Sequence, residues 1–239
     1  MLQIEVSKRM KLIVVGCEYA GKTTLIKRIA KWWEDKVGAK LPIHDHFTYP
    51  LGGDGEHREI SEEELEKLSA LGPAGREMFQ RYLMDYHLGA GFSGDDDLVL
   101  VGFHIEDAVY APLYYGYGRP KEYGDRVQYA RYIDYMIMKY RPDTVLILVK
   151  ASPETIRRRM KENPHPRGVL QDKDVEYVLE RFEEEYERSL IRKKFTLDTT
   201  DATVEETFKD FLKAMEPHFR PIDTLRMLQH KFLKEEIEK

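Results

Sequence analysis

The chain has 239 residues, a formal net charge of −5 and one cysteine, and 42% of its residues are hydrophobic. This length can bury one substantial core, and a single cysteine excludes an internal disulfide, so we expect a protein of a reducing compartment, the cytoplasm. The small acidic excess argues against bulk binding to nucleic acid or to an anionic membrane, and no apolar run approaches the length of a membrane span.

Short apolar runs alternate with amphipathic helical patterns along most of the chain. The first buried strand is expected from Lys11 to Val15, and a helical pattern starts at Lys22. Further strands are expected at residues 42–49, 98–105, 144–149 and 194–197. Further helices are expected to begin near Ser61, Pro73, Asp125, Pro153, Asp174, Thr203 and Asp223. This alternation predicts βαβ units around a central parallel sheet, an α/β fold.

The strongest motif is residues 16–23, Gly-Cys-Glu-Tyr-Ala-Gly-Lys-Thr, between the first strand and the first helix. It matches G-x-x-x-x-G-K-[ST], a phosphate-binding loop in which backbone N–H groups and a helix N-terminus surround a phosphate. We expect Lys22 to reach the β- and γ-phosphates and Thr23 to hold Mg²⁺. The residues predicted to cradle the nucleotide are Gly16, Glu18, Tyr19, Ala20, Gly21, Lys22, Thr23 and Thr24.

The phosphate-binding loop predicts NTP binding without fixing the reaction. A GTPase needs an N-K-x-D motif after a late strand to recognise guanine, and residues 148–152 read L-V-K-A-S instead. Motor ATPases usually need a longer chain and oligomeric partners. We therefore favour a kinase that uses ATP and Mg²⁺, and we keep a nucleotide-dependent binding switch as the alternative outside enzymes.

An acidic pair, Glu106 and Asp107, follows the apolar run at residues 98–105. Carboxylates at the carboxyl ends of parallel strands face the phosphate site in folds of this kind. We expect one of the pair to hold Mg²⁺ and one to accept the proton of an acceptor hydroxyl, the alternative being an exposed acidic loop. We interpret His104 and the segment His44-Asp45-His46 as structural, because no Cys/His cluster supports a metal site.

A basic stretch between Pro and Gly residues, 157–168, follows the predicted strand at 144–149. Phosphoryl transfer spreads negative charge over the γ-phosphate oxygens, and a mobile arginine can neutralise that charge when a site closes. We therefore predict a lid here, with Arg159 and Arg167 as candidate catalytic residues. Adjacent arginines cannot all face one site, so Arg157 and Arg158 are weaker candidates that also suit a solvated helix face.

Several segments resemble, in order, motifs of the thymidylate kinase and deoxynucleoside kinase superfamily. Glu18 stands where the thymidylate kinase loop carries an acidic residue, and residues 50–53 with Arg58 are similar to the R-E-P-G-G segment and its following arginine. Glu106-Asp107 stands where the family has D-R-Y or E-R-S, whose glutamate is the general base of deoxynucleoside kinases. The resemblance implies a three-layer P-loop kinase domain at 1–220, with a helical acceptor region near 61–91.

The stretch 221–239 reads as a separate terminal helix. Such a helix packs on its own domain or on a second copy of the chain, so a homodimer remains open.

Two departures from the family motifs concern the acceptor. Residues 48–50 read Thr-Tyr-Pro where R-E-P is expected, and Asp107 stands where an arginine is expected. An unpaired dianion in a dry site is costly, so the loss of both arginines favours an acceptor with a neutral hydroxyl. We predict a nucleoside or nucleotide-like acceptor, with a modified base or end of a polynucleotide as the alternative. The residues expected to bind it are Tyr49, Arg58, Gln80, Arg81 and Arg119.

Overall fold

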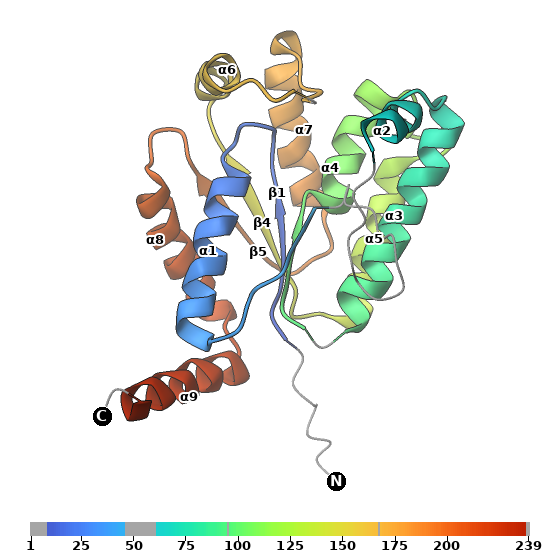
Figure 1. The fold of residues 1–239 in the computed structure, drawn as a ribbon. Helices are drawn as coiled ribbons and strands as arrows, with labels where there is room; N and C mark the ends of the chain where they lie inside the picture. Colours follow the sequence, from blue (N-terminus) through green and yellow to red (C-terminus); the bar gives the residue numbers. More distant parts are fainter. Residues whose placement is uncertain (1–8, 46–60, 95, 167, 238–239) are drawn as a thin grey trace.

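The computed structural model describes residues 9–45, 61–94, 96–166 and 168–237. Within them, five parallel strands form one sheet in the order β2-β3-β1-β4-β5, with helices on both faces (Figure 1). The strands are β1 Lys11–Val15, β2 Ile43–Asp45, β3 Leu98–Val101, β4 Val145–Lys150 and β5 Lys193–Asp198. This arrangement confirms the predicted three-layer α/β fold with a central parallel sheet.

Helices form the two outer layers of the molecule. The helices are α1 Lys22–Val37, α2 Glu62–Ser69, α3 Pro73–Ser93, α4 Phe103–Tyr110, α5 Arg126–Tyr140, α6 Pro153–Glu162, α7 Val175–Arg188, α8 Val204–Met215 and α9 Pro221–Ile237. A π-helical turn, Ala111–Tyr115, continues α4, and 3-10 turns occur at Asp172–Asp174 and Glu216–His218. Helices α1 and α8 cover one face of the sheet, and α3, α4, α5 and α7 lie on the other.

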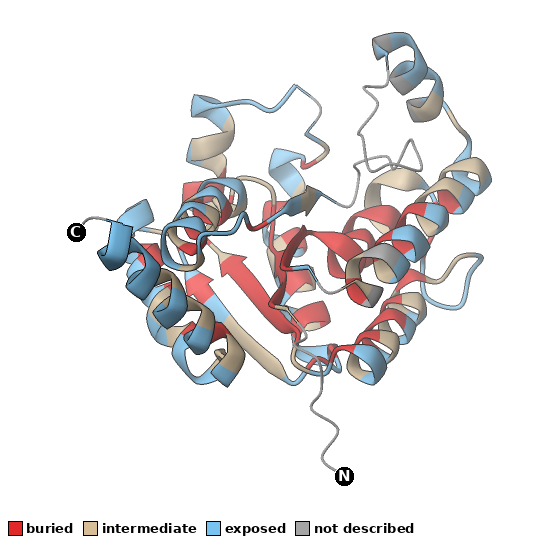
Figure 2. Cartoon of the chain, turned by 60° about the horizontal axis from the view of Figure 1, so that its bottom comes forward, coloured by how far each residue is buried: buried red, intermediate tan, exposed pale blue. Residues whose placement is uncertain are grey.

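The core lies in and around the middle strands of the sheet. Every residue of β1 and β3 is buried, as expected for parallel strands that are covered on both faces (red in Figure 2). Strand β1 pairs with β3 on one side and with β4 on the other. The loop that follows β1 therefore emerges at the centre of the carboxyl edge of the sheet, where ligands bind in open α/β folds.

Local capping signals place several helix starts where the sequence predicts them. Ser61 caps α2 and Thr203 caps α8, and each forms a capping box with a glutamate three residues later, Glu64 and Glu206. A capping box satisfies two backbone N–H groups that the first turn of a helix leaves without partners. Asp125 caps α5 through its side chain. These starts depend on short-range contacts, which is why the sequence reveals them.

The expected strand at residues 98–105 is wrong in its second half. Strand β3 ends at Val101, and α4 begins at Phe103. Gly102 and Phe103 have positive φ values of 75° and 52°, which turn the chain sharply from strand to helix. Positive φ is rare for a bulky side chain, and the Phe103 ring is fully buried, so packing holds the turn. Glu106 and Asp107 consequently lie on a helix and not in a loop.

The hydropathy pattern could not reveal this boundary. A buried strand that runs directly into a buried helix is continuously apolar, so periodicity alone does not separate the two.

Helix α9 packs on α1 and is tied to the core by a buried ion pair. Arg226 donates to the two carboxylate oxygens of Asp97 at 3.0 and 2.6 Å. Asp97 also accepts hydrogen bonds from Met10 N and Trp33 Nε1. The helix thus packs on its own domain, and a homodimer and a domain boundary at residue 220 stay predictions.

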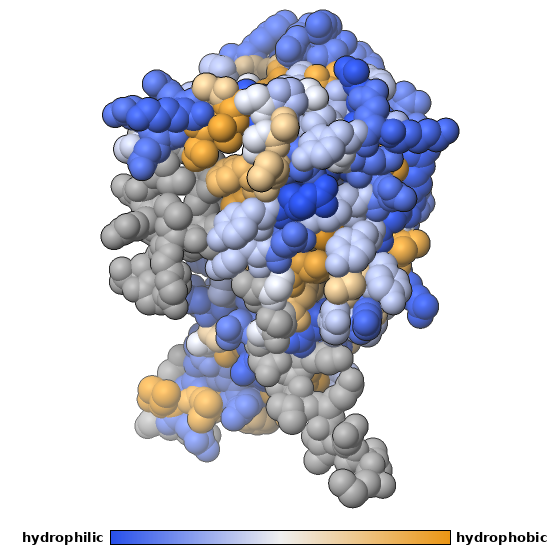
Figure 3. Space-filling model, turned by 90° about the vertical axis from the view of Figure 1, so that its right-hand side faces the viewer, coloured by the Kyte–Doolittle hydropathy of each residue, from blue (hydrophilic) through white to orange (hydrophobic). Residues whose placement is uncertain are grey.

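The outward face of α3 and α5 is mixed in hydropathy, with small apolar patches among hydrophilic side chains (Figure 3). The large hydrophobic side chains exposed on α3 and α5 are Met78, Tyr82, Tyr86, Tyr132, Tyr135 and Tyr140. In the part of the chain that the structure describes, no helix combines the length and the apolar character that crossing a membrane requires.

Candidate active site

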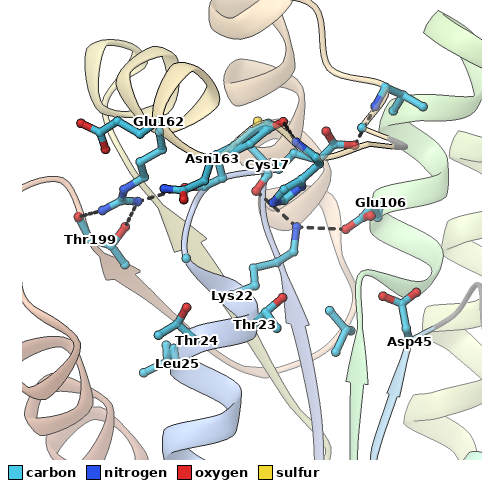
Figure 4. A pocket seen from close by; sticks show the side chains of 18 of the residues that line it. Cys17, Lys22, Thr23, Thr24, Leu25, Asp45, Glu106, Glu162, Asn163 and Thr199 are labelled. Carbon is cyan, nitrogen blue, oxygen red and sulfur yellow. Dashed lines mark hydrogen bonds and ion pairs between the residues drawn. The ribbon is translucent and has the colours of Figure 1, made fainter.

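A cavity of about 1070 Å³ lies at the carboxyl edge of the sheet, around the loop between β1 and α1 (Figure 4). It extends from the ends of β2 and β3, across the loop, to the start of α8. Near β2 and β3 it is lined by Asp45, Val101, Glu106, Tyr110 and Tyr115, and near α6 and α8 by Arg159, Asn163, Thr199, Val204 and Thr207. Pockets for single small molecules measure roughly 300–1,000 Å³, so this cavity can hold a nucleotide beside a second molecule.

The loop after β1 turns as the motif predicts. A Cβ at Gly16 would lie 2.3 Å from the Val149 carbonyl oxygen, so only glycine lets the loop pass β4 this closely. Gly21, with φ 91°, stands at the N-cap of α1. The free N–H groups at the start of α1 therefore border the cavity and can bind a phosphate. All of the predicted cradle residues except Gly16 and Ala20 line the cavity.

The Lys22 ammonium lies between the phosphate-binding loop and α4. It donates hydrogen bonds to the carbonyl oxygens of Gly16 and Cys17, and it lies 3.2 Å from Glu106 Oε2 (Figure 4). The side chains of Lys22 and Glu106 are 11% and 12% exposed. An incoming phosphate would compete with Glu106 for this ammonium, so the ion pair connects phosphate binding with the state of a carboxylate.

The two acidic residues of α4 point to different places. Glu106 faces Lys22 in the cavity. Asp107 lies in the helix layer, where its Oδ2 is 2.7 Å from Arg126 Nε and its Oδ1 accepts a hydrogen bond from the Tyr117 hydroxyl at 3.2 Å. Successive residues of a helix point about 100° apart, which explains the divergence. The structure therefore places Glu106 at the candidate site and Asp107 in a second, buried network.

Arg126 is the centre of that buried network. Its guanidinium is 1% exposed and also lies 3.3 Å from Glu77 Oε1, and the rings of Tyr117 and Tyr129 lie 4.9 and 5.0 Å from it. Burial alone would lower the pKa of Arg126, but Asp107 above all raises the pKa above its ordinary value. Two carboxylates pair with this guanidinium, so its positive charge is already neutralised and does not favour binding of an acceptor phosphate.

Asp45 is a cavity carboxylate that the sequence interpretation missed. It is the last residue of β2, and its side chain lies on the same side of the cavity as Glu106 (Figure 4). Strand β2 pairs in parallel with β3, with Asp45 opposite Val101, and α4 begins directly after β3, so the end of β2 and the start of α4 bring Asp45 and Glu106 to one edge of the sheet. The available signal was an acidic residue at the carboxyl end of a short strand, whereas the sequence interpretation takes His44-Asp45-His46 as structural because no Cys/His cluster supports a metal site.

The oxygen atoms near Lys22 suit Mg²⁺. The side chains of Thr23, Asp45 and Glu106 line one cavity, and among the described residues the buried Glu106 Oε2 has no hydrogen-bond partner beyond its ion pair. In the described ranges, no three His, Cys, Asp or Glu side chains gather to hold a metal by themselves. This donor set fits Mg²⁺, which phosphoryl-transfer sites hold through one or two protein oxygens and the substrate phosphates.

Arg159 is the described lid arginine that lines the cavity. It donates hydrogen bonds to the Tyr19 carbonyl oxygen at 3.0 Å and to Thr199 Oγ1 and O at 3.0 and 2.6 Å. Burial, and then the charge of Arg158, lower the pKa of Arg159 from its ordinary value. Arg157 instead pairs with two carboxylates near the start of α7, as expected for a solvated face.

The other predicted residues do not gather in one place. Three of them lie outside the described residues: Tyr49, Arg58 and Arg167. Arg81 pairs with Glu77 one turn earlier on α3, and Arg119 is exposed. The side-chain oxygen of Gln80 is buried without a hydrogen-bond partner, so it can accept a bond from a ligand.

The fold and the phosphate-binding loop define a class, the P-loop kinase fold. No protein-family model matches the chain, and no curated protein sequence matches it. Among solved structures, deoxyadenosine kinase from M. mycoides with bound dATP is similar at TM-score 0.55 and 16% identity, covering 87% of this chain and 100% of that one. A thymidylate kinase from Ehrlichia chaffeensis is similar at TM-score 0.52 and 13% identity, covering 87% and 99%.

A third similar structure is the YorR protein from Bacillus subtilis in complex with phosphorylated GDP, at TM-score 0.53 and 18% identity, covering 88% of this chain and 99% of that one. These likenesses show the fold, and they confirm the resemblance to nucleoside and nucleotide kinases at that level.

Proposed function

We propose that this protein is a kinase that transfers the γ-phosphoryl group of ATP, in the presence of Mg²⁺, to a hydroxyl group of a nucleoside or nucleotide-like acceptor. The observation that carries the proposal is the single cavity in which the lysine of a phosphate-binding loop, Lys22, meets the carboxylates of Glu106 and Asp45. A phosphate donor and a proton acceptor thereby share one cavity, as phosphoryl transfer to a hydroxyl requires.

The donor nucleotide is assigned to the half of the cavity between α1, α6 and α8. The amides at the start of α1 and the Lys22 ammonium bind the β- and γ-phosphates, and the base lies toward Asn163 and Thr207. Bound Mg²⁺ supplies charge neutralisation for the phosphates, and Thr23 and a carboxylate hold it. Arg159 borders the same space and stabilises charge on the phosphoryl group.

The acceptor is assigned to the half of the cavity near β2 and α4. Glu106 accepts the proton of the acceptor hydroxyl once phosphate oxygens take over its interaction with Lys22. Asp45, on the neighbouring strand, is placed to hold Mg²⁺ through its carboxylate. Tyr110 and Tyr115 line this half and offer aromatic surface to the acceptor.

The charges near the acceptor half support a neutral hydroxyl acceptor over a monophosphate. Two carboxylates, Asp45 and Glu106, border this half. Arg126, the most deeply buried arginine of this region, is already balanced by Asp107 and Glu77. Among the described residues of this half, a phosphate dianion would meet more negative than positive charge once the donor phosphates engage Lys22, which disfavours such an acceptor.

The test is transfer of labelled γ-phosphoryl from ATP and Mg²⁺ to nucleosides, nucleoside monophosphates and short DNA and RNA oligomers. Lys22→Ala and Glu106→Gln are compared with wild type and with Glu187→Gln, an exposed carboxylate on α7, as a matched control. We expect label in a nucleoside, lost in the two site variants and kept in the control.

Label in monophosphates would overturn the argument from charge, and label in an oligomer, with strongly salt-dependent binding, would identify a polynucleotide acceptor. Bound ATP with no transfer to any acceptor would contradict the kinase proposal and favour a nucleotide-dependent switch.

A further inference from the structure

Glu18, in the phosphate-binding loop, reaches across to the segment that follows α6. Its carboxylate accepts hydrogen bonds from Val169 N at 3.1 Å and from Leu170 N at 3.4 Å. These residues are about 150 positions away in sequence, so the contact is a tertiary one that neither segment makes alone. Hydrogen bonds to a charged acceptor are roughly twice as strong as neutral ones, which makes this carboxylate an effective anchor for two backbone amides.

Tyr19, the next residue, reaches the same segment. Its ring stacks on the ring of His165 at 4.3 Å between centroids, and its hydroxyl accepts a hydrogen bond from His165 N at 3.0 Å. Tyr19 has a positive φ of 65°, an uncommon conformation for a residue other than glycine. The contacts of the Tyr19 ring and hydroxyl with His165 hold this backbone conformation. Strained conformations persist where surrounding contacts fix them in this way.

The backbone of Glu18 is fixed from the opposite side. Its N–H donates a hydrogen bond to the Tyr110 hydroxyl at 3.0 Å. Tyr110 stands one helical turn after Glu106, on the same face of α4. Glu18 is therefore held between α4 and the segment after α6, and its carboxylate, at the wall of the cavity, is occupied by two backbone amides.

We propose that Glu18 and Tyr19 act as a latch: they hold the described residues 165–166 and 168–170 as a roof over the nucleotide half of the cavity. His165, Pro166, Gly168 and Val169 line that half, so the latched segment closes it. Glu18 is thus a positioning residue for the roof, besides being part of the cavity wall. The inference rests on the proposed function in one respect, because it takes the space under the roof to be the nucleotide site.

The latch predicts that a bound nucleotide leaves only after the contacts of Glu18 and Tyr19 break. Removing the two hydrogen bonds of Glu18 should therefore accelerate nucleotide dissociation by about tenfold, the factor that corresponds to about 1.4 kcal/mol. A glutamine at this position keeps one accepting oxygen and should preserve part of the effect.

The first experiment is hydrogen exchange of the nucleotide-free protein, followed at the Val169 and Leu170 amides. Wild type is compared with Glu18→Ala, Glu18→Gln and the exposed-site control Glu187→Ala. We expect protection of both amides to be lost in Glu18→Ala, partly kept in Glu18→Gln and unchanged in the control. Unchanged protection in Glu18→Ala would overturn the latch.

The second experiment is stopped-flow dissociation of a fluorescent ATP analogue from the same variants, with melting temperatures measured alongside. Faster dissociation at an unchanged melting temperature supports the roof, since a merely structural residue would change both. Equal dissociation rates would overturn the role of the latch in nucleotide retention. Should Glu18→Ala fail to fold, Tyr19→Phe, which keeps the ring and removes the hydroxyl, decides through exchange at the His165 amide.

The two experiments separate this inference from the proposed function. Failure of the analogue to bind wild type would refute the nucleotide site and the roof's role, while the exchange result would still decide whether the latch exists.

Discussion

Helix α4 carries two ion pairs formed by consecutive residues, one facing the cavity and one in the helix layer. Glu106 meets one lysine in a cavity, and both side chains keep some exposure. Asp107 meets Arg126 with both side chains 1% exposed, and Glu77 completes a sealed network with Tyr117. The first pair can exchange partners with a ligand, whereas the second cannot without exposing the core. Two consecutive residues of one helix can therefore differ in role, one being available to a ligand and the other contributing to stability.

The largest expected effect is that of Glu106→Gln. Removing a general base costs roughly 10²–10⁴-fold in rate, so we expect kcat for phosphoryl transfer to fall by this range. The melting temperature should change little, because the pair borders a cavity. A variant with wild-type kcat would show that Glu106 takes no part in proton transfer.

Asp107→Asn is expected to show the opposite pattern. Breaking a buried ion pair leaves an unbalanced charge and costs about 3–5 kcal/mol in the free energy of unfolding, which urea denaturation measures. The folded fraction should retain phosphoryl transfer, since Asp107 lies away from the cavity. If stability stays unchanged while transfer is lost, the assignment of the two carboxylates must be exchanged.

Asp45→Asn tests the second carboxylate of the cavity, at the end of β2, against Glu106 on α4. If Asp45 holds Mg²⁺, we expect the Mg²⁺ concentration for half-maximal activity to rise by roughly 10–100-fold, the range seen when support of a metal is removed. A Mg²⁺ titration of activity measures this shift, with Glu187→Gln as the matched control. An unchanged titration curve would remove Asp45 from the metal site.

Asp97 tests whether a third ion pair, with Arg226 11% and Asp97 4% exposed, serves stability as the pair of Asp107 does. Burial alone would raise the pKa of Asp97, but Arg226 and the Met10 amide lower it below its ordinary value. Because the folded pKa is depressed, the stabilisation is present above the unfolded pKa of about 3.9 and is lost as pH falls through the folded pKa.

At pH 7 we expect Asp97→Asn to lower the free energy of unfolding by about 1–3 kcal/mol. The difference from wild type should shrink as the pH falls below about 4, as urea denaturation at several pH values would measure. A difference that is constant across pH would contradict the assigned cause.

How much the sequence could predict depends on the range of the contacts involved. The loop at residues 16–23 and the helix starts at Ser61 and Thr203 depend on neighbours within a few residues, and the sequence locates them. The end of β3 depends on how Phe103 packs, and the hydropathy of the run hides it. Local sequence patterns therefore predict the fold and the phosphate-binding loop of the site.

The other contacts in and around the site join residues that are far apart in sequence. The partner of Asp107 lies on α5, and the amides bound by Glu18 lie beyond α6. No spacing rule connects such residues, because tertiary packing alone brings them together. The same limit explains why Asp45 was missed, since its position at the cavity follows from the pairing of β2 with β3.

The attachment of α9 has a consequence for synthesis of the chain on the ribosome. Arg226 is 129 residues later than Asp97, its partner. At about 5–20 residues per second, the distance of 129 residues takes roughly 6–26 seconds to translate. During that interval the carboxylate, with Met10 and Trp33 already available, lacks its balancing charge. Helix α9 thus supplies the balancing charge of the carboxylate just before β3 only after all five described strands have been synthesised.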